Sequence, residues 1–482
     1  MSRVAVSARR GAPGDTDADT RVVGLFEGES PEDAQLKELA DSGEAKGGYK
    51  KLAVTHADGK RVIAVGLGKR DEFDGEKARG AAAVAAGRAS ELGARSLSWA
   101  APSPEVVGPI VEGTLLKLYK FDRFKSKTDD EEDSDSSNGV ASLEVSSPDA
   151  DLDDVVFESR VRAEATNRTR DLQNLPSNVA TPDFLAGRAE EIADAHASLE
   201  FEAFNREGIL SMGMGSFAAV AQGTYAEPRL IVLRYSSPNA TGPHLALVGK
   251  AVTFDTGGIS IKPAGKMHEM KFDMSGGAAV IEAMNAIAEL EVPVRVTAVV
   301  PATENMPSGR SVKPGDIVTA MNGKTIEVNN TDAEGRLILA DALCYAVDQG
   351  AERLVDIATL TGAIVVALGS TFCGLFSNDD DWFAQVDAAG KATGELGWRM
   401  PLHAEYLELT KGTYADLQNA SEQRKASSAY AAEFLRQFVD DRPWVHMDIA
   451  GTAWATGRPY AGNGATGFGT RTFIELAESL AR

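Results

Sequence analysis

The sequence predicts an α/β protein in which a smaller N-terminal α/β domain, residues 1–155, precedes a larger C-terminal α/β/α domain, residues 156–482, with a mixed, mainly parallel sheet. The length of 482 residues suits two domains. Short segments rich in β-branched residues alternate with helix-like segments in both halves, which is the pattern of βαβ units. A strongly acidic run at 129–139 lies between the halves and is typical of a solvated linker.

The N-terminal half contains four short strand-like segments and one alanine-rich helical segment. The expected strands are at 21–27, 51–55, 61–66 and 97–100, and the expected helix is at 76–92. From residue 125 to 154 the composition changes, and we interpret the acidic run 129–139 within this stretch as a solvated loop or linker. The domain boundary is therefore expected near 150–160.

The C-terminal half alternates strands and helices more regularly. A helix is expected to begin with Thr181 as its N-cap and Pro182 at its first position. Strands are expected at 230–233, 244–248, 294–300 and 354–358, and further helices at 277–290 and 337–347. Such alternation predicts a mainly parallel sheet covered on both faces. Ligand sites in such sheets lie beyond the carboxyl ends of the strands.

Composition excludes several classes of function. The chain has 71 acidic and 49 basic residues and a net charge of −22, which disfavours nucleic-acid binding and binding to anionic membranes. Two cysteines cannot form a disulfide framework, and no secretory signal is visible at the N-terminus, so we expect a cytoplasmic protein. The apolar stretch 354–376 is long enough to span a membrane, but Asp356 and three glycines favour a buried strand followed by a tight loop.

Familiar motifs of other enzyme classes are absent. The sequence has no phosphate-binding P-loop and no Gly-x-Ser-x-Gly nucleophile elbow. Its six histidines are scattered, so a catalytic metal would have to be held by carboxylates.

One loop after a predicted strand combines unusual residues. Lys250 and Lys262 flank Asp255, and Gly257 and Gly258 follow the aspartate closely. Two adjacent glycines allow the backbone to approach a ligand. Such a loop at the end of a strand is a candidate binding site.

Three further carboxylates lie near the starts of predicted helices. Asp273 precedes one helix, and Asp332 and Glu334 precede another. If 331–335 is extended, the side chains of Asp332 and Glu334 point to the same side. Together with Asp255 they would place four carboxylates in a small volume, where like charges raise one another's pKa. Two divalent cations about 3.5–4 Å apart would resolve that repulsion.

Each residue also has a simpler interpretation. Taken singly, Asp332 is compatible with a turn or N-cap residue, and Lys250 with a surface amine. Their clustering on successive loops at one end of a sheet favours the metal site.

These motifs resemble those of a known family. The octapeptide Asn-Thr-Asp-Ala-Glu-Gly-Arg-Leu at 330–337 is similar to the signature of the leucyl aminopeptidase (cytosolic aminopeptidase) family. The similarity covers about residues 165–475. Further matching segments lie at 171–178, 213–223, 248–263, 304–309, 313–316, 358–362 and 446–451.

The resemblance implies a dimetal centre. Asp255 and Glu334 would bridge two divalent metal ions, and Asp332 would complete the more exchangeable site. Lys250 and Asp273 would complete the tighter site. Manganese or zinc is favoured, although cobalt or magnesium can also fill oxygen-rich sites.

The resemblance also implies catalytic and substrate-binding residues. Lys262 would stabilise the oxyanion formed when water attacks the scissile carbonyl, and Arg336 would hold a bicarbonate ion that relays a proton. Peptide substrates would bind backbone atoms around Leu360. An apolar pocket that prefers leucine would be lined by Met270, Thr359, Gly362, Ala450 and Ala453.

The resemblance further implies a homohexamer of two stacked trimers. Two departures from the family pattern bear on this assembly: residues 420–429 lack the glycine-containing loop usual in the family, and 129–139 is an acidic insertion.

Two other functions stay open from the residues, a two-metal phosphoesterase and a non-catalytic DNA-binding role. The net charge of −22 argues against the second.

Overall fold

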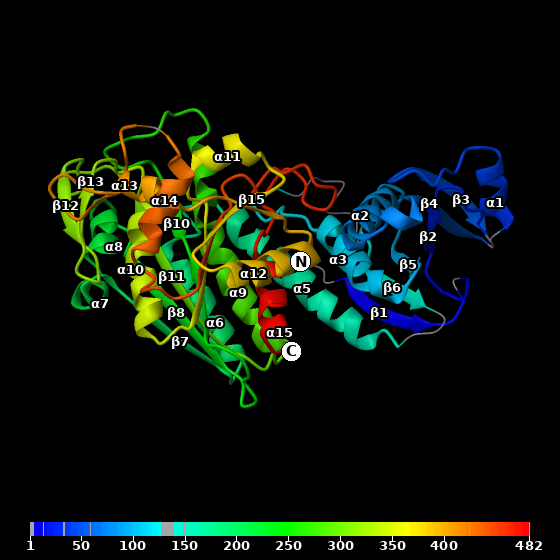
Figure 1. The fold of residues 1–482 in the computed structure, drawn as a ribbon. Coiled ribbons are helices and arrows are strands. Elements are labelled where there is room, and N and C mark those ends of the chain that lie inside the picture. The colour runs from blue at the N-terminus through cyan, green and yellow to red at the C-terminus, as the bar shows by residue number, and fades with distance from the viewer. Residues whose placement is uncertain are drawn as a thin grey trace. The chain divides into compact units, whose positions relative to one another are not determined.

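The chain forms two compact units. The computed structural model describes residues 4–12, 14–31, 34–57, 59–126, 139–147, 151–423 and 425–481. One unit comprises residues 1–167 and 457–462, and the other comprises 168–456 and 463–482. The chain passes from the first unit to the second within helix α5, Asp153–Asn174 (Figure 1), and the predicted boundary after residue 155 falls at the start of this helix.

The smaller unit is built on one sheet. The described strands run in the order β1-β6-β5-β2-β4-β3 and are parallel, except that β3 is antiparallel to β4. The alanine-rich helix α2 packs closely on α3 because its buried face carries mainly alanine. The elements are β1 Ala5–Arg10, β2 Thr20–Phe26, α1 Ala34–Asp41, β3 Leu52–Ala57, β4 Lys60–Gly68, α2 Gly75–Glu91, β5 Ser96–Ala100, α3 Val107–Leu118 and β6 Ser142–Ser147.

The expected strands and helix of this unit are confirmed as β2, β3, β4, β5 and α2. Strands β1 and β6 were not predicted. Strand β6, Ser142–Ser147, follows the acidic run; its Leu143 and Val145 are fully buried, and it lies between β1 and β5. Of the acidic run, residues 129–138 lie outside the described residues.

The larger unit is built on a mixed sheet. In the described residues its order is β16-β15-β18-β14-β9-β11-β8-β7, with β10 paired to β11. The central strands β18, β14, β9 and β11 are parallel. Strand β8 is antiparallel to β11 and β7, and β15 is antiparallel to β18 but parallel to β16. The strands are β7 Leu199–Phe204, β8 Arg229–Ser236, β9 Leu245–Gly249, β10 Ala251–Asp255, β11 Arg295–Asn305, β14 Arg353–Ala358, β15 Cys373–Ser377, β16 Gly397–Arg399 and β18 Trp444–Asp448.

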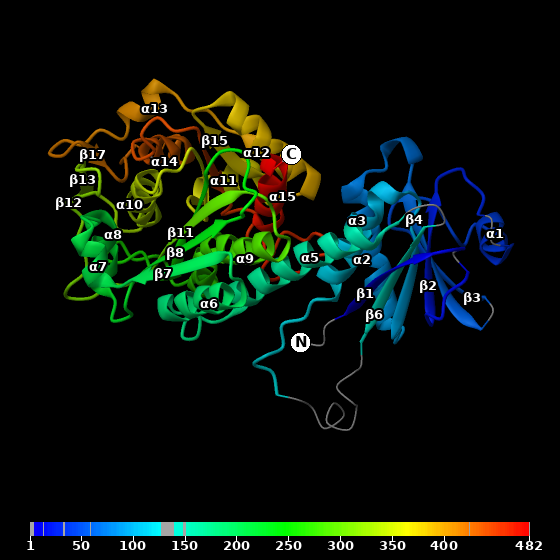
Figure 2. The same cartoon turned by 90° about the horizontal axis from the view of Figure 1, so that it is seen from below.

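Helices cover both faces of this sheet (Figures 1 and 2). Helices α6, α9, α12 and α15 pack together on one face, and α8, α10 and α14 pack on the other. Strands β12 Asp316–Thr319, β13 Thr325–Val328 and β17 Leu417–Gln418 form a small separate sheet. The helices are α6 Pro182–Ala195, α7 Arg206–Ser211, α8 Gly215–Val220, α9 Ser275–Glu289, α10 Gly335–Asp348, α11 Gly362–Leu368, α12 Asp380–Thr393, α13 Ala404–Glu408, α14 Ser427–Arg436 and α15 Thr470–Ala481.

The predicted elements of this unit are confirmed as β8, β9, β11, β14, α6, α9 and α10. Thr181 caps α6 as expected, because its side-chain oxygen accepts a hydrogen bond from the Phe184 N–H at 3.2 Å. The apolar stretch 354–376 consists of most of β14, then α11, then most of β15. Among the described helices, none has both the length and the apolar character needed to cross a membrane.

Two buried histidines of this unit experience opposite pKa shifts. His446 is fully buried, and its Nδ1 donates a hydrogen bond of 2.6 Å to Asp356 Oδ1. Burial lowers the pKa of His446, but the negative charge of Asp356 outweighs it and raises the pKa overall. The Nδ1 atom of His244 lies 3.1 Å from the Gly350 carbonyl oxygen. Burial lowers its pKa, and the charge of Arg295 lowers it further.

Candidate active site and metal centre

The predicted site residues lie around the carboxyl ends of the central strands. Lys250 connects β9 to β10, and Asp255 is the last residue of β10. Asp273 lies in the 3₁₀ segment Met267–Met274, directly before α9. Glu334 immediately precedes α10. Loops distant in sequence are therefore brought together at one edge of the sheet, as expected for this fold class.

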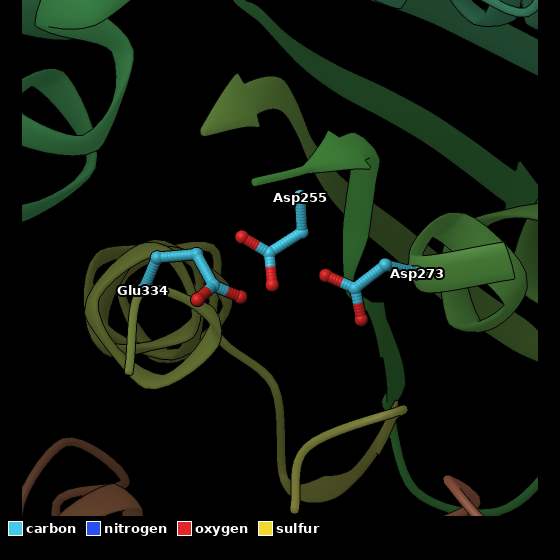
Figure 3. Close-up of side chains that lie close together, drawn as sticks. All are labelled: Asp255, Asp273 and Glu334. Atoms are coloured by element: carbon cyan, nitrogen blue, oxygen red, sulfur yellow. The ribbon is translucent and has the colours of Figure 1, made fainter. Parts of the chain in front are cut away.

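Three buried carboxylates form the centre of the site. Asp255, Asp273 and Glu334 each place one carboxylate oxygen within 4.8 Å of the other two. Their side chains point toward one another from three separate elements (Figure 3). Their exposed fractions are 2%, 7% and 2%. Burial of like charges at this distance is unfavourable unless cations compensate them.

Lys250 provides one such cation. Its Nζ lies 2.8 Å from Asp273 Oδ1 and 2.8 Å from Glu334 Oε1, and it donates a hydrogen bond of 3.2 Å to the Thr359 carbonyl. An ammonium group has three N–H donors, so these three contacts use all of them. Burial lowers the pKa of Lys250, but the charges of Asp273 and Glu334 outweigh it and raise the pKa.

Lys262 connects the cluster to the fourth carboxylate. Its Nζ lies 2.7 Å from Asp255 Oδ2 and also pairs with Asp332 Oδ1. The Lys262 side chain is 21% exposed and that of Asp332 is 31% exposed, so this side of the site is open to solvent. Burial lowers the pKa of Lys262, but the charges of Asp255 and then Glu334 raise it well above its ordinary value.

The carboxylates themselves are strongly perturbed. Burial and then the charge of Glu334 raise the pKa of Asp255 to about 6. Burial likewise raises the pKa values of Asp273 and Asp332, against the opposing charges of Lys250 and Lys262 respectively. Burial also acts to raise the pKa of Glu334, but Lys250 and then Lys262 hold it below its ordinary value. Perturbation of this kind is typical of functional sites.

The residues fit divalent metal ions. Asp273 Oδ2 and Glu334 Oε2 are buried and have no hydrogen-bond partner among the described residues. Four carboxylates surround two ammonium groups, which leaves negative charge uncompensated. Oxygen-rich donor sets of this composition bind manganese, zinc, cobalt or magnesium.

The backbone of the loops is shaped by glycine. Gly257 and Gly258 have φ values of +86° and +63°. A Cβ at Gly257 would lie 2.8 Å from Asp332 Oδ1, and a Cβ at Gly258 would lie 2.8 Å from Asn305 Oδ1. Any larger residue would therefore both strain the backbone and displace side chains of the site.

The expectation of an extended backbone at 331–335 is wrong. The Ala333 N–H donates to the Asn330 carbonyl at 3.2 Å, which closes a turn, and Glu334 has the helical angles φ −74° and ψ −34°. The carboxylate of Asp332 therefore reaches Lys262, whereas that of Glu334 reaches Lys250.

Two residues that sequence reasoning did not single out hold these loops. Asn305 Nδ2 donates to Asp255 Oδ1 at 2.8 Å and to the Thr331 carbonyl at 3.0 Å. Thr331 Oγ1 donates to the Gly257 carbonyl at 2.7 Å. Asn305 lies in the matched segment 304–309 and Thr331 in the octapeptide, so the motifs contained both, but only the fold assigns their partners.

Arg336 is buried at the start of α10. Its exposed fraction is 4%, and its Nη1 donates a hydrogen bond to the Asn419 carbonyl. Its guanidinium carbon lies 5.1 Å from the centre of the Tyr430 ring. Asn419 and Tyr430 are further residues that sequence reasoning missed. They flank the segment 420–429, whose loop shape was in doubt, and α14 begins within it at Ser427.

The predicted pocket residues lie on three segments that the structure connects. Thr359 Oγ1 donates to Asp273 Oδ1 at 2.7 Å, so the β14–α11 loop contacts the metal cluster. Leu360 and Gly362 follow in this loop. The rings of Phe272 and Trp454 are stacked with centroids 5.2 Å apart, which joins the segment of Met270 to that of Ala450 and Ala453.

Comparison with known proteins identifies the family. Residues 167–474 match the Cytosol aminopeptidase family, catalytic domain, and residues 22–128 match the N-terminal domain of the same family. A probable cytosol aminopeptidase of Solibacter usitatus is 45% identical, covering 98% of this chain and 98% of its own length. One from Roseiflexus castenholzii is 43% identical with the same coverage. The chain belongs to the cytosol aminopeptidase family.

Solved structures agree with this assignment. A leucine aminopeptidase mutant from tomato has a TM-score of 0.88 and 32% identity, covering 99% of this chain and 96% of the other. The bottromycin maturation enzyme BotP in complex with Mn has a TM-score of 0.87 and 34% identity, covering 96% of this chain and 100% of the other. The protein is therefore a metal-dependent aminopeptidase, a hydrolase with the predicted two-domain α/β architecture.

Proposed function

We propose that this aminopeptidase releases N-terminal residues, preferentially leucine and other apolar ones, from peptides with the help of two divalent metal ions. The observation that carries the proposal is the buried cluster of Asp255, Asp273 and Glu334 beside Lys250 and Lys262, in which Asp273 and Glu334 each keep one oxygen without a hydrogen-bond partner among the described residues. These three carboxylates are close enough together to hold a metal ion, and they lie within the part of the chain that matches the catalytic domain of the family.

Each ligand has a proposed place. Asp255 and Glu334 would contact both ions, Asp332 would complete the solvent-facing site, and Asp273 would complete the inner site together with Lys250. Lys250 would bind as a neutral amine, because the charge of the ions lowers its pKa and the ammonium proton leaves when metal binds. The exposed fractions of the two side chains support this division, since the side chain of Asp332 is 31% exposed and that of Asp273 is 8% exposed. The bound ions, with manganese or zinc favoured, would polarise the scissile carbonyl and make a water more acidic.

Lys262 is proposed to bind the oxyanion that develops on the substrate. Its raised pKa keeps the side chain protonated, so it acts as a donor and not as a base. Its contacts with Asp255 and Asp332 fix the ammonium at the solvent-facing side, where a peptide can reach it. A donor held in place before the reaction needs no reorganisation when charge develops.

Arg336 is proposed to hold a bicarbonate ion that moves a proton. The Asn419 carbonyl and the Tyr430 ring fix its guanidinium group, while its Nε has no hydrogen-bond partner among the described residues. A planar guanidinium matches the geometry of a carbonate-like anion.

The leucine preference would arise from the pocket of Met270, Thr359, Gly362, Ala450 and Ala453, with the backbone of Leu360 binding the peptide.

Chelation followed by metal restoration tests the proposal. The protein is stripped of metal and assayed on Leu-p-nitroanilide after addition of Mn, Zn or Co. We expect activity to vanish and return, with Leu-p-nitroanilide turned over faster than Ala- or Glu-p-nitroanilide. Hydrolysis of a phosphate ester without anilide turnover would instead support a two-metal phosphoesterase, and full activity after chelation would refute the metal mechanism.

We further propose that the chain works in the cytoplasm as a homohexamer. Six chains of 50.9 kDa give 6 × 50.9 ≈ 305 kDa and a net charge of 6 × −22 = −132. Self-repulsion of this size is screened by salt, so salt should favour the assembled form. Light scattering at low and high salt measures this, and an active protein of about 51 kDa in both conditions would contradict it. A salt-dependent DNA shift assay is expected to be negative.

A further inference from the structure

Asp448 makes an unusual set of contacts for a core residue. It ends β18, and its exposed fraction is 0%. Its Oδ1 accepts hydrogen bonds from the backbone N–H groups of Leu360 at 3.2 Å, Thr361 at 3.3 Å and Ala450 at 3.3 Å. Its Oδ2 accepts a hydrogen bond of 2.6 Å from Thr361 Oγ1. One carboxylate therefore ties together two loops that follow neighbouring strands.

The β14–α11 loop is fixed from both sides. Thr359 is held by the metal cluster, because its carbonyl accepts from Lys250 Nζ at 3.2 Å and its hydroxyl donates to Asp273 Oδ1 at 2.7 Å. Thr361 is held by Asp448, and its hydroxyl also lies 2.7 Å from Ser428 Oγ of α14. Leu360 lies between these two anchors and has little freedom to move.

Burying a carboxylate carries a cost in free energy. The strand partner of Asp448 in β14 is Ala358, whose methyl group offers the carboxylate no hydrogen bond. A buried charge persists where hydrogen bonds satisfy it, and four donors do so here. Those donors belong to the segments that carry Leu360, Gly362, Ala450 and Thr359, which contacts Lys250 and Asp273, so the carboxylate is placed where it can shape the proposed substrate pocket.

We propose that Asp448 is a positioning residue that sets the side-chain specificity of the aminopeptidase. By fixing the loop from Thr359 to Gly362 against Ala450, it holds the two walls of the pocket at a constant separation. It does not touch the reacting atoms. This inference rests on the proposed leucine preference and on the proposed pocket residues.

The test compares Asp448→Asn with a matched variant, Asp341→Asn. Asp341 is also fully buried, in α10, and it also accepts backbone hydrogen bonds, from Phe217 N at 2.8 Å and Met321 N at 2.7 Å. Both variants change a buried carboxylate to an amide, but only Asp448 contacts the pocket loops. Each metal-loaded protein is assayed on Leu-, Met-, Ala- and Gly-p-nitroanilide, with metal content and melting temperature measured in parallel.

We expect Asp448→Asn to keep the wild-type metal content while the ratio of kcat/KM for Leu over Ala falls by about tenfold, mainly through KM for the leucine substrate. Asp341→Asn should lower the melting temperature without changing this ratio. If Asp448→Asn does not fold, Thr361→Val removes the same hydroxyl bond from the other side and should give the same change in the ratio.

The possible results distinguish a failure of the proposed leucine preference from a failure of the proposed role of Asp448. A wild-type enzyme without any preference for leucine would overturn both the proposed function and the role of Asp448. A wild-type preference that survives unchanged in Asp448→Asn, or in Thr361→Val where that variant replaces it, would overturn only the role of Asp448. An equal loss on all substrates in Asp448→Asn would show that Asp448 merely supports the fold.

Discussion

Replacing Lys262 by methionine removes the ammonium group but keeps most of the aliphatic side chain. In the structure this ammonium contacts Asp255 at 2.7 Å and also pairs with Asp332, which uses two of its three N–H donors. One donor is left for a substrate oxygen. Lys250, by contrast, has all three donors engaged and a side chain only 3% exposed. Lys262 is therefore the lysine of the cluster that can bind an oxyanion.

The expected size of the effect follows from the loss of that one donor. Removal of a single oxyanion-binding group lowers kcat by about 10²–10³-fold, or about 2.7–4 kcal/mol of transition-state stabilisation. The same change removes a positive charge from a site surrounded by carboxylates. Affinity for divalent cations should therefore be maintained or increased, because less positive charge opposes them.

The assay combines steady-state kinetics on Leu-p-nitroanilide with elemental analysis of bound metal. Lys266→Met is the matched control, since this lysine lies in the same loop but has an 80% exposed side chain and pairs only weakly with Glu269 at 3.7 Å. We expect Lys262→Met to lose kcat at wild-type metal content and Lys266→Met to behave as wild type. A Lys262→Met enzyme changed in KM alone would show that the lysine binds the substrate without stabilising the oxyanion.

Other perturbations probe the cluster and the buried histidines. Glu334→Gln preserves side-chain shape but removes a buried charge, so bound metal and activity should be lost while the circular dichroism spectrum is retained. Gly335→Ala would place a Cβ 2.7 Å from Lys250 Nζ, so activity and melting temperature should fall although alanine favours helix by up to about 1 kcal/mol. His446 should stabilise the fold fully below about pH 6.5 and lose that contribution as pH rises through its raised pKa. His244, whose pKa is lowered, should contribute fully above about pH 6.5 and lose that contribution as pH falls.

The glycine and histidine predictions each have a control. Gly187→Ala in α6 adds a methyl group with no atom within 4 Å, so it should maintain or raise the melting temperature. For the histidines, unfolding free energies of wild type and the His446→Gln and His244→Gln variants are compared from pH 5 to 9. Each tenfold difference in proton affinity between the folded and unfolded chains is worth about 1.4 kcal/mol. Differences of the same sign for both variants across this range would contradict the assigned pKa shifts. A Gly335→Ala enzyme with wild-type activity would contradict the expected clash with Lys250.

The strands buried on both faces of a sheet were the easiest to predict. Leu245–Gly249 and Arg353–Ala358 are apolar runs bounded by polar residues, and both were found close to their true limits. Ala5–Arg10 and Ser142–Ser147 escaped because their residues are mostly small or polar. None of the residues of Ala5–Arg10 is buried, and the place of Ser142–Ser147 in the sheet depends on pairing with distant strands. The direction of β7, β8 and β15 is also set by distant partners, which local pattern does not contain.

The site was predictable to the extent that it is encoded in contiguous motifs. All four carboxylates and both lysines lie in segments whose residue types are unusual together. Asn419 and Tyr430 carried no such signal, because their role depends on a contact with Arg336 across more than eighty residues. The turn at 331–335 was misjudged because alternation of side chains was assumed for a segment that closes a hydrogen-bonded turn before the helix.

The charge balance of the cluster indicates that the chain can fold without bound metal. Asp255, Asp273, Asp332 and Glu334 would carry −4 if fully ionised, and the ammonium groups of Lys250 and Lys262 reduce this to −2. Without those lysines, burial of four carboxylates would oppose folding strongly. With them, burial and then the remaining repulsion between carboxylates raise the pKa values of the three aspartates. The chain can therefore fold before metal arrives, so chelation should abolish activity without unfolding the protein, and restoration of activity by added metal becomes a fair test of the proposed mechanism.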